Sequence, residues 1–270
     1  MAESTLHKVF NFIKKYPKTE SLVWKFWYQY LTNLDKKADM IFMNYGYESK
    51  RKVLLEKVDE GNRYCIQLYD HVIHKVNLKN LDVLEVGCGR GGGSSYIMKY
   101  IHPKSMIGLD FSDKAIEFCK KHYIIKGLSF IAGDAESLPF DSNKFNVVIN
   151  IESSHCYANM TKFLSEVSRV LKKAGYFLFA DFRKKEDLGI LFEQLNNSGF
   201  ELLDQQNITK NALKLLDLDN VRKIKLIERK VPMIFRRIFY EFAAIGSSDV
   251  YESFKTGKRE YFSFILKKKK

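Results

Sequence analysis

The chain has 270 residues, of which 46% are hydrophobic and 29% charged, a composition typical of a folded globular protein rather than a disordered one. Its length suits one large domain with appendages. No apolar run reaches about 18 residues, which argues against a transmembrane helix, and the first residues lack the layout of a secretory signal. We therefore expect a cytoplasmic protein.

The formal net charge is +13, and much of it lies near the end of the chain. Residues 208–270 contain 16 Lys or Arg and 7 Asp or Glu. Such a segment could contact nucleic acid, an anionic membrane surface or an acidic substrate, but a solvated surface explains the charge equally well. The four cysteines are scattered without a C-x-x-C pair, so the sequence suggests neither a zinc site nor a disulfide framework.

Residues 5–31 contain two helical patterns, both aromatic and basic, that are separated around Pro17. Aromatic side chains crowd nearly all sides of the second pattern, so it must pack against another part of the protein or lie at an interface. We prefer packing over the core to membrane contact, and we assign residues 1–60 to an N-terminal helical lid.

Residues 81–93, L-D-V-L-E-V-G-C-G-R-G-G-G, combine an apolar run with a glycine cluster. The run predicts a buried parallel strand, and the glycines predict a tight turn that a ligand can approach closely. A helix beginning at Ser94 would point its first N–H groups toward that ligand. Because Gly87, Gly89 and Gly92 also satisfy G-x-G-x-x-G, the turn alone fits a dinucleotide site as well.

The pattern then alternates between strand and helix, which predicts an α/β protein. We expect further strands at 105–112, 128–140, 145–151, 176–183, 199–208 and 259–267, with Ser112 capping one helix and another running from Thr161 to Gly175. The expected fold is a Rossmann-like, seven-stranded, mostly parallel sheet with helices on both faces. Its cofactor-binding core would comprise residues 61–207 and 258–270, and residues 208–257 would form a helical cap over the substrate mouth, inserted before the last strand.

Two acids follow predicted strands. Asp110 ends the second strand, 23 residues beyond Gly87, about where a carboxylate should accept both ribose hydroxyls of an adenosine cofactor. Phe111 would then lie against the adenine. Asp134 follows the third strand in G-D-A-E-S-L-P-F. An acidic turn before a proline would account for an aspartate here, but not for the position of Asp134 relative to the preceding motifs.

The motif E-V-G-C-G-R-G at 85–91 resembles the first motif of class I S-adenosylmethionine-dependent methyltransferases. The resemblance implies that the loop of Gly87 and Gly89 wraps the methionine part of the cofactor while Glu85 anchors its ammonium group. It further implies that Asp134 accepts the adenine amino group, that the backbone N–H of Ala135 meets the ring, and that the strand end at Asn150 borders the transferable methyl group. The segment N-Y-G-Y at 44–47 resembles one in which a tyrosine closes over the cofactor, here Tyr47 or Tyr45, although an ordinary aromatic turn fits nearly as well.

Two further residues are candidates for catalysis. His155 follows the fourth strand in E-S-S-H-C-Y, and Asp181 ends the fifth, so the expected sheet order brings both to one mouth. An aspartate can hold an imidazole so that its free nitrogen accepts a proton from a hydroxyl. These segments resemble O-methyltransferases of natural-product sugars and of mycobacterial phthiotriol-type lipids, which implies that His155 is the base and Asp181 its partner. No histidine has metal-ligand spacing with carboxylates, and we expect a metal-independent enzyme.

We therefore predict transfer of a methyl group from S-adenosyl-L-methionine to a hydroxyl of a lipophilic or glycosidic small molecule. One alternative is C-methylation of a sterol-like or terpenoid alkene, against which the histidine argues. Another is a methylase that uses its basic surface to bind RNA or an anionic membrane; nucleic acid is disfavoured because N-I-E-S stands at 150–153 in place of an N-P-P-Y-type tetrapeptide. The acceptor and the oligomeric state stay open.

Overall fold

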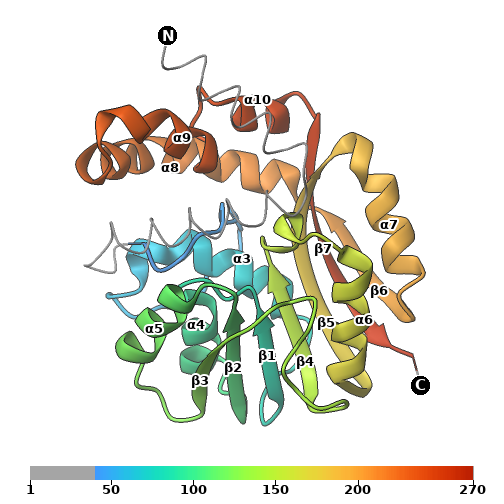
Figure 1. Ribbon diagram of the computed structural model, residues 1–270. Helices are drawn as coiled ribbons and strands as arrows, with labels where there is room; N and C mark the ends of the chain where they lie inside the picture. Colours follow the sequence, from blue (N-terminus) through green and yellow to red (C-terminus); the bar gives the residue numbers. More distant parts are fainter. Residues whose placement is uncertain (1–39, 270) are drawn as a thin grey trace.

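The structure is a computed structural model that describes residues 40–269 (Figure 1). The helices expected at 5–31 lie outside the described residues. The strands are β1 (Asp82–Val86), β2 (Ser105–Asp110), β3 (Leu128–Ala132), β4 (Phe145–Ile151), β5 (Leu171–Lys184), β6 (Phe200–Asn207) and β7 (Arg259–Lys268). The α-helices are α3 (Arg63–Ile73), α4 (Gly92–Tyr100), α5 (Asp113–His122), α6 (Met160–Val170), α7 (Leu188–Asn196), α8 (Thr209–Lys230), α9 (Arg236–Phe242) and α10 (Asp249–Lys255).

All seven strands form one sheet in the order β3-β2-β1-β4-β5-β7-β6. The first five pair in parallel, whereas β7 runs antiparallel between β5 and β6. The expected fold class is therefore confirmed. The order reverses between β1 and β4, and in open parallel sheets such a reversal leaves a crevice at the carboxyl ends of the strands.

The sheet is buried on both faces because successive side chains of its central strands point to opposite sides. In β1, Val83 packs into the hydrophobic cluster that includes α3, α4 and α10, whereas Leu84 packs into the cluster that includes α6 and α7. Ile149 and Val148 of β4 divide in the same way. This continuous apolar burial on two sides fixes the position of the strand ends, and with them the loops that follow.

The two predicted helix caps had different outcomes. Ser112 accepts a hydrogen bond from the backbone N–H of Ala115 and caps α5, as expected. The helix cap expected at Thr161 was wrong, since Asn159 accepts from the backbone N–H of Lys162 and α6 begins at Met160.

The helix end expected at Gly175 was also wrong. Helix α6 ends at Val170, and β5 begins at the next residue. Gly175 lies inside β5, where the register shifts and where a Cβ would stand 2.9 Å from the carbonyl oxygens of Asn146 and Lys172. The glycine thus allows a close approach of backbone at an irregularity in the strand, not the end of a helix.

The segment between β6 and β7 contains α8, α9 and α10, which lie together across one end of the sheet (Figure 1). Ile227, Phe239 and Ile245 form a small core of their own there, while Phe254 of α10 joins the main core. None of the helices between residues 40 and 269 has both the length and the apolar character that a membrane crossing needs. The division of the chain into lid, core and cap stays a prediction.

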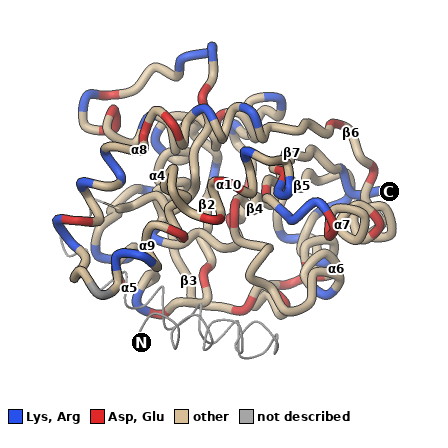
Figure 2. The backbone as a smooth tube through the Cα atoms, turned by 90° about the horizontal axis from the view of Figure 1, so that it is seen from above, with Lys and Arg blue, Asp and Glu red and all other residues tan. Residues whose placement is uncertain are grey.

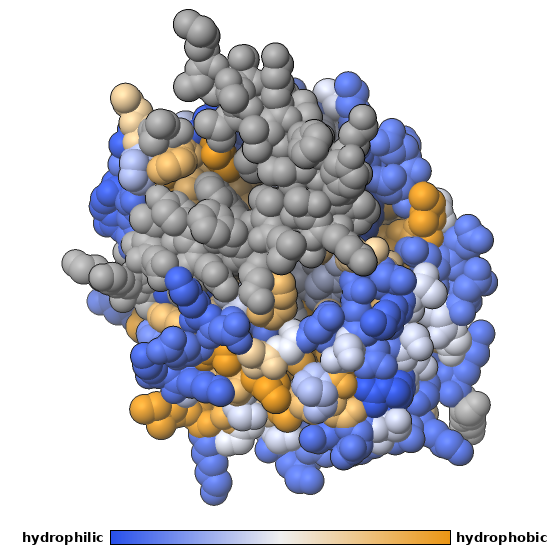
Figure 3. All heavy atoms as spheres, in the orientation of Figure 1, coloured by the Kyte–Doolittle hydropathy of each residue, from blue (hydrophilic) through white to orange (hydrophobic). Residues whose placement is uncertain are grey.

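Basic residues are spread around the molecule. Viewed from above, Lys and Arg occur along α8 and around the perimeter of the described structure (Figure 2). The space-filling view shows a mostly hydrophilic surface with hydrophobic side chains in smaller groups (Figure 3).

Candidate functional site

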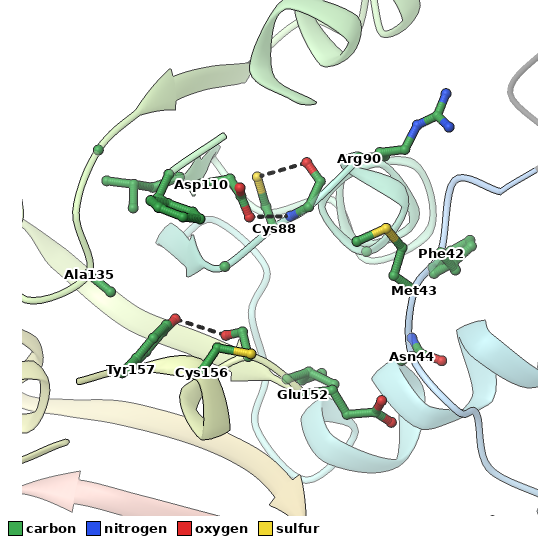
Figure 4. A pocket seen from close by; sticks show the side chains of 18 of the residues that line it. Phe42, Met43, Asn44, Cys88, Arg90, Asp110, Ala135, Glu152, Cys156 and Tyr157 are labelled. Atoms are coloured by element: carbon green, nitrogen blue, oxygen red, sulfur yellow. Dashed lines mark hydrogen bonds between the residues drawn. The ribbon is translucent and has the colours of Figure 1, made fainter. Parts of the chain in front are cut away.

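A cavity of about 290 Å³ lies at the carboxyl ends of β1, β2 and β4, at the crevice that the sheet order predicts (Figure 4). Its walls come from the glycine turn after β1 and from the loops after β2, β3 and β4. The segment 41–44, which is irregular, covers it from another side. Parts of the chain far apart in sequence therefore meet around one space.

The glycines of the turn after β1 leave space for the cavity because they carry no side chains. Gly87 has φ +78°, and a Cβ at that position would lie 2.2 Å from the Ser153 hydroxyl oxygen. The backbone N–H groups of Gly87 and Cys88 both donate to the carbonyl of Leu109, at 2.8 and 3.0 Å, which ties the turn to β2. A residue other than glycine would be strained there and would also close the gap between the loops.

Asp110 is held by backbone on both of its carboxylate oxygens. The N–H of Gly89 donates to Oδ2 and the N–H of Ser112 donates to Oδ1, each at 2.9 Å. Burial raises the pKa of Asp110, and these backbone donors oppose the rise. The carboxylate thus stands at a fixed place in the cavity wall, where it can accept hydrogen bonds from a ribose.

The other residues expected to bind the nucleoside surround the same space. Phe111, Asp134 and Ala135 line the cavity together with Asp110. Asp134 is exposed and accepts a hydrogen bond from the backbone N–H of Glu136 at 2.8 Å. One wall therefore combines an aromatic ring, a half-buried acid and an exposed acid, a chemistry that fits an adenosine.

Three of the predicted cofactor residues do not line the cavity. Glu85 is 1% exposed, and its carboxylate accepts hydrogen bonds from Tyr69 and Ser94, so it lies behind Tyr69, which does line the cavity. Asn150 is fully buried and donates to the hydroxyl oxygens of Ser153 and Tyr157, which stand in the wall in its place.

Tyr47 lies away from the cavity. Its ring stacks on His71 with 4.3 Å between centroids, and its backbone N–H donates to the carbonyl of Tyr64. The wall that it was expected to form is made by Phe42, Met43 and Asn44, a few residues earlier in the chain.

His155 and Asp181 do come together. The imidazole Nδ1 lies 2.8 Å from Asp181 Oδ1, and the backbone N–H of His155 donates to Oδ2 at 2.9 Å. The imidazole packs beside Phe182, 4.4 Å between centroids, and 20% of the His155 side chain is exposed. Ser153 and Cys156 of the same loop line the cavity, whereas His155 and Asp181 are not themselves among its lining residues.

Asp181 is buried and has partners on both oxygens. Ser154 donates to Oδ2 at 2.6 Å, Arg183 pairs with the same oxygen at 3.0 Å, and the backbone N–H of Phe182 donates to Oδ1 at 2.8 Å. Burial would raise the pKa of Asp181, but Arg183, His155 and these donors together hold it well below its usual value. Asp181 is therefore an ionised carboxylate in the interior.

The charge state of His155 follows from its neighbours. Burial lowers the pKa of His155, but the contacts with Cys156 and Asp181 outweigh burial and raise it to about 10. An imidazole in this setting binds its proton more tightly than a free one.

Several residues of the site were not predicted from sequence. They include Tyr69 on α3, which contacts Glu85, and Glu152, which lies in the loop predicted to carry the chemistry but was given no role. Both line the cavity. Burial raises the pKa of Glu152 to about 7, against hydrogen bonds from Tyr45 and Tyr261 that favour its ionised form. No local sequence signal marks these residues, because their partners are distant in the chain.

Comparison with known proteins bears on this site. Residues 77–224 match a family described as a methyltransferase domain. The chain is 36% identical to a phthiotriol/phenolphthiotriol dimycocerosates methyltransferase of Mycobacterium leprae over 91% of this chain and 92% of that protein. It is 35% identical to a fatty-acid O-methyltransferase of Mycolicibacterium smegmatis over 89% and 88% of the two chains. A solved cyclopropane synthase from Mycobacterium tuberculosis has a similar fold, with a TM-score of 0.67 and 14% identity over 87% and 95% of the two chains.

Proposed function

The chain belongs to the S-adenosylmethionine-dependent methyltransferases, and on this premise we propose that it methylates a hydroxyl of a lipophilic small molecule with His155 as general base. The observation that carries the proposal is the contact between His155 and Asp181, in a loop that also contributes Ser153 and Cys156 to the cavity wall. The proposed reaction needs no metal ion.

Asp110, Phe111, Asp134 and Ala135 would hold the adenosine part of the cofactor, and the turn of Gly87 and Gly89 would face its amino-acid part. When bound, the cofactor supplies a methyl group on a sulfonium sulfur, which is already activated for transfer. The protein must then bring an acceptor into line with that methyl group and remove the acceptor's proton.

Proton removal is assigned to the imidazole of His155. Asp181 accepts the hydrogen bond from Nδ1–H, which leaves Nε2 as the nitrogen that accepts a proton from the acceptor. Because Asp181 stays ionised, it also stabilises the imidazolium that forms when the proton is taken. Arg183 and Ser154 keep the carboxylate in place during this change of charge.

The acceptor is proposed to be lipophilic because the relatives at 35–36% identity are named for phthiotriol-type lipids and for fatty acids. The apolar side chains of Phe42, Met43 and Ile151 in the cavity wall are consistent with such an acceptor. C-methylation of an alkene is the competing activity; it would produce a carbocation that loses a proton, and its product would contain a new carbon–carbon bond instead of an ether.

The test compares His155→Ala with His74→Ala. His74 is an exposed histidine whose ring nitrogen contacts backbone carbonyls of its own helix turn, so it serves as the matched control. With long-chain alcohols and labelled S-adenosylmethionine, we expect ether products, loss of turnover by about 100-fold or more in His155→Ala, and unchanged cofactor affinity by calorimetry in both variants. Retained turnover in His155→Ala would remove the base assignment, and products with a new carbon–carbon bond would favour the competing activity.

We also propose that the enzyme works in the cytoplasm against an anionic membrane surface, through α8. Lys214, Leu218, Val221 and Lys225 are spaced by four, three and four residues and so share one face of this helix. Leu218 is 56% and Val221 62% exposed, and Met233, just beyond the helix, is 81% exposed. Hydrophobic side chains bordered by cations are suited to the headgroup region of an anionic bilayer, and hydrophobic side chains do reach the surface over the cap (Figure 3).

Sedimentation with vesicles of phosphatidylglycerol and phosphatidylcholine tests this contact. We expect binding to the anionic vesicles that weakens as salt rises, and a loss of binding in Leu218→Ser/Val221→Ser. Equal partition to both vesicle types would show that the basic residues do not contribute to binding. No effect of the double substitution would show that this face of α8 does not contact the membrane.

A further inference from the structure

Glu152 is the first residue after β4, at the start of the loop that carries His155, and its backbone is unusual. It has φ +49°, a left-handed conformation that residues with a side chain adopt rarely. Its N–H donates to the carbonyl of Ala180 at 2.9 Å, so the turn is fixed to β5. A conformation of this kind persists when surrounding contacts hold it, and such positions often have a functional reason.

The Glu152 carboxylate joins three distant parts of the chain. The backbone N–H of Tyr45 donates to both of its oxygens, at 2.9 and 3.0 Å, and the hydroxyl of Tyr261 donates to Oε1 at 2.8 Å. Tyr45 follows the segment 41–44, and Tyr261 lies on β7. Glu152 thus ties the end of β4 to the segment that covers the cavity.

The segment 41–44 is packed directly against the glycine turn. A Cβ at Gly92 would lie 2.6 Å from the carbonyl oxygen of Ile41, and a Cβ at Gly89 would lie 3.6 Å from the terminal carbon of Met43. In the close view Met43 lies between the turn and Glu152, and the Glu152 carboxylate lies on the side of Asn44 (Figure 4). A small outward movement of this segment would therefore open the wall at the glycine turn.

The same tether reaches the proposed base. The Tyr45 ring stacks on Phe182 with 5.2 Å between centroids, and Phe182 packs against His155 at 4.4 Å. The position of Tyr45 therefore affects both the wall of the cofactor cavity and the support beneath the imidazole.

We propose that Glu152 is a positioning residue that holds the segment 41–45 closed over the cofactor, so that cofactor affinity depends on its hydrogen bonds to the backbone N–H of Tyr45. The proposal rests on the proposed function only for the identity of the cofactor. Glu152 acts through the segment and does not take part in proton removal.

The experiment measures amide hydrogen exchange in the full-length protein without ligand, and then the affinity for S-adenosylmethionine and S-adenosylhomocysteine by calorimetry. In Glu152→Ala we expect exchange in residues 41–46 to quicken at least tenfold and both dissociation constants to rise about tenfold. The KM for the cofactor should rise with them, with a smaller change in kcat. Glu152→Gln keeps a carbonyl oxygen that can accept from Tyr45, so it should restore slow exchange and most of the affinity.

The matched control is Glu166→Ala. Glu166 also accepts a hydrogen bond from a distant backbone N–H, that of Leu138 at 2.7 Å, but on α6 and outside the cavity wall. This substitution should quicken exchange near residue 138 and leave 41–46 unchanged.

Unchanged exchange at 41–46 in Glu152→Ala would overturn the proposal, as would a Gln variant as impaired as the Ala variant. A fall in kcat with unchanged cofactor affinity would instead make Glu152 part of the chemistry and would equally overturn it. Exchange and binding need no acceptor, so these outcomes are independent of whether the protein methylates a lipophilic hydroxyl.

Discussion

The Asp181 carboxylate holds His155 at two places, the imidazole Nδ1 at 2.8 Å and the backbone N–H at 2.9 Å. The first contact orients the ring, and the second fixes the loop that carries it. The same buried anion also raises the pKa of His155. The orientation of the imidazole and its affinity for protons therefore cannot vary independently.

The first prediction concerns pH. Contacts with Cys156 and Asp181 outweigh burial and raise the pKa of His155 to about 10, so near neutral pH most of the imidazole is protonated and cannot act as a base. The fraction in the basic form grows as pH rises. Methyl transfer to an alcohol should therefore increase with pH, with an inflection above the ordinary histidine value of about 6.5.

A carboxylic acid acceptor provides the control for this pH profile. A fatty acid is already ionised in this range and needs no base, so its methylation, if the enzyme accepts it, should not rise with the titration of His155. A flat or falling profile with the alcohol would contradict the role of His155.

The second prediction is that Asp181→Asn lowers turnover and shifts the pH profile toward acid. An amide cannot stabilise the imidazolium as an anion does, so the pKa of His155 should fall toward its ordinary value. Turnover at the plateau should drop by about 100-fold, because the ring also loses its fixed orientation. The measurement is kcat against pH for this variant beside Asp141→Asn, an exposed acid outside the cavity. An unshifted profile would mean that Asp181 does not set the proton affinity of His155.

The meeting of His155 and Asp181 could be predicted from sequence because it depends on a general rule. Parallel strands place their carboxyl ends at one edge, so residues that follow adjacent strands approach each other. The same rule placed Asp110 and Asp134 around one cavity. Continuous apolar runs and a glycine turn were enough to indicate those strand ends.

The structure places three of the predicted cofactor residues away from the cavity wall, for a different reason. Tyr47, Glu85 and Asn150 were placed by motif, and a motif gives the position of a backbone but not what a side chain contacts. Glu85 faces Tyr69 and Ser94, and Tyr47 faces His71, in each case a partner on another element. The role of Glu152 depends on a contact with Tyr45, 107 residues away, which no periodicity reveals.

The third prediction ranks the two acids of the nucleoside wall. Asp110 accepts from the N–H groups of Gly89 and Ser112, so Asp110→Ala removes the proposed ligand contact and also frees one backbone donor of the glycine turn and one at the start of α5. We expect S-adenosylmethionine to bind about 100-fold more weakly, which corresponds to about 2–3 kcal/mol. Asp134 is exposed, and Asp134→Ala should cost about tenfold or less. Calorimetry with both variants decides the order, and the opposite ranking would mean that the adenine contact dominates affinity.

The last prediction compares two glycines. A Cβ at Gly93 would lie 2.0 Å from the Tyr69 ring, so Gly93→Ala must displace a side chain that lines the cavity. Tyr69 donates to Glu85 at 2.6 Å, and moving it would leave a buried carboxyl, whose pKa burial already raises to about 7, with one donor fewer. We expect a loss of about 2–4 kcal/mol in the free energy of unfolding and weaker cofactor binding.

The control for this prediction is Gly189 in α7, where a Cβ would have no neighbour within 4 Å. Gly189→Ala should be neutral or stabilise by up to about 1 kcal/mol and leave cofactor binding unchanged. Urea unfolding and calorimetry on both variants test this, and equal stability of the two would show that Tyr69 can move aside without cost.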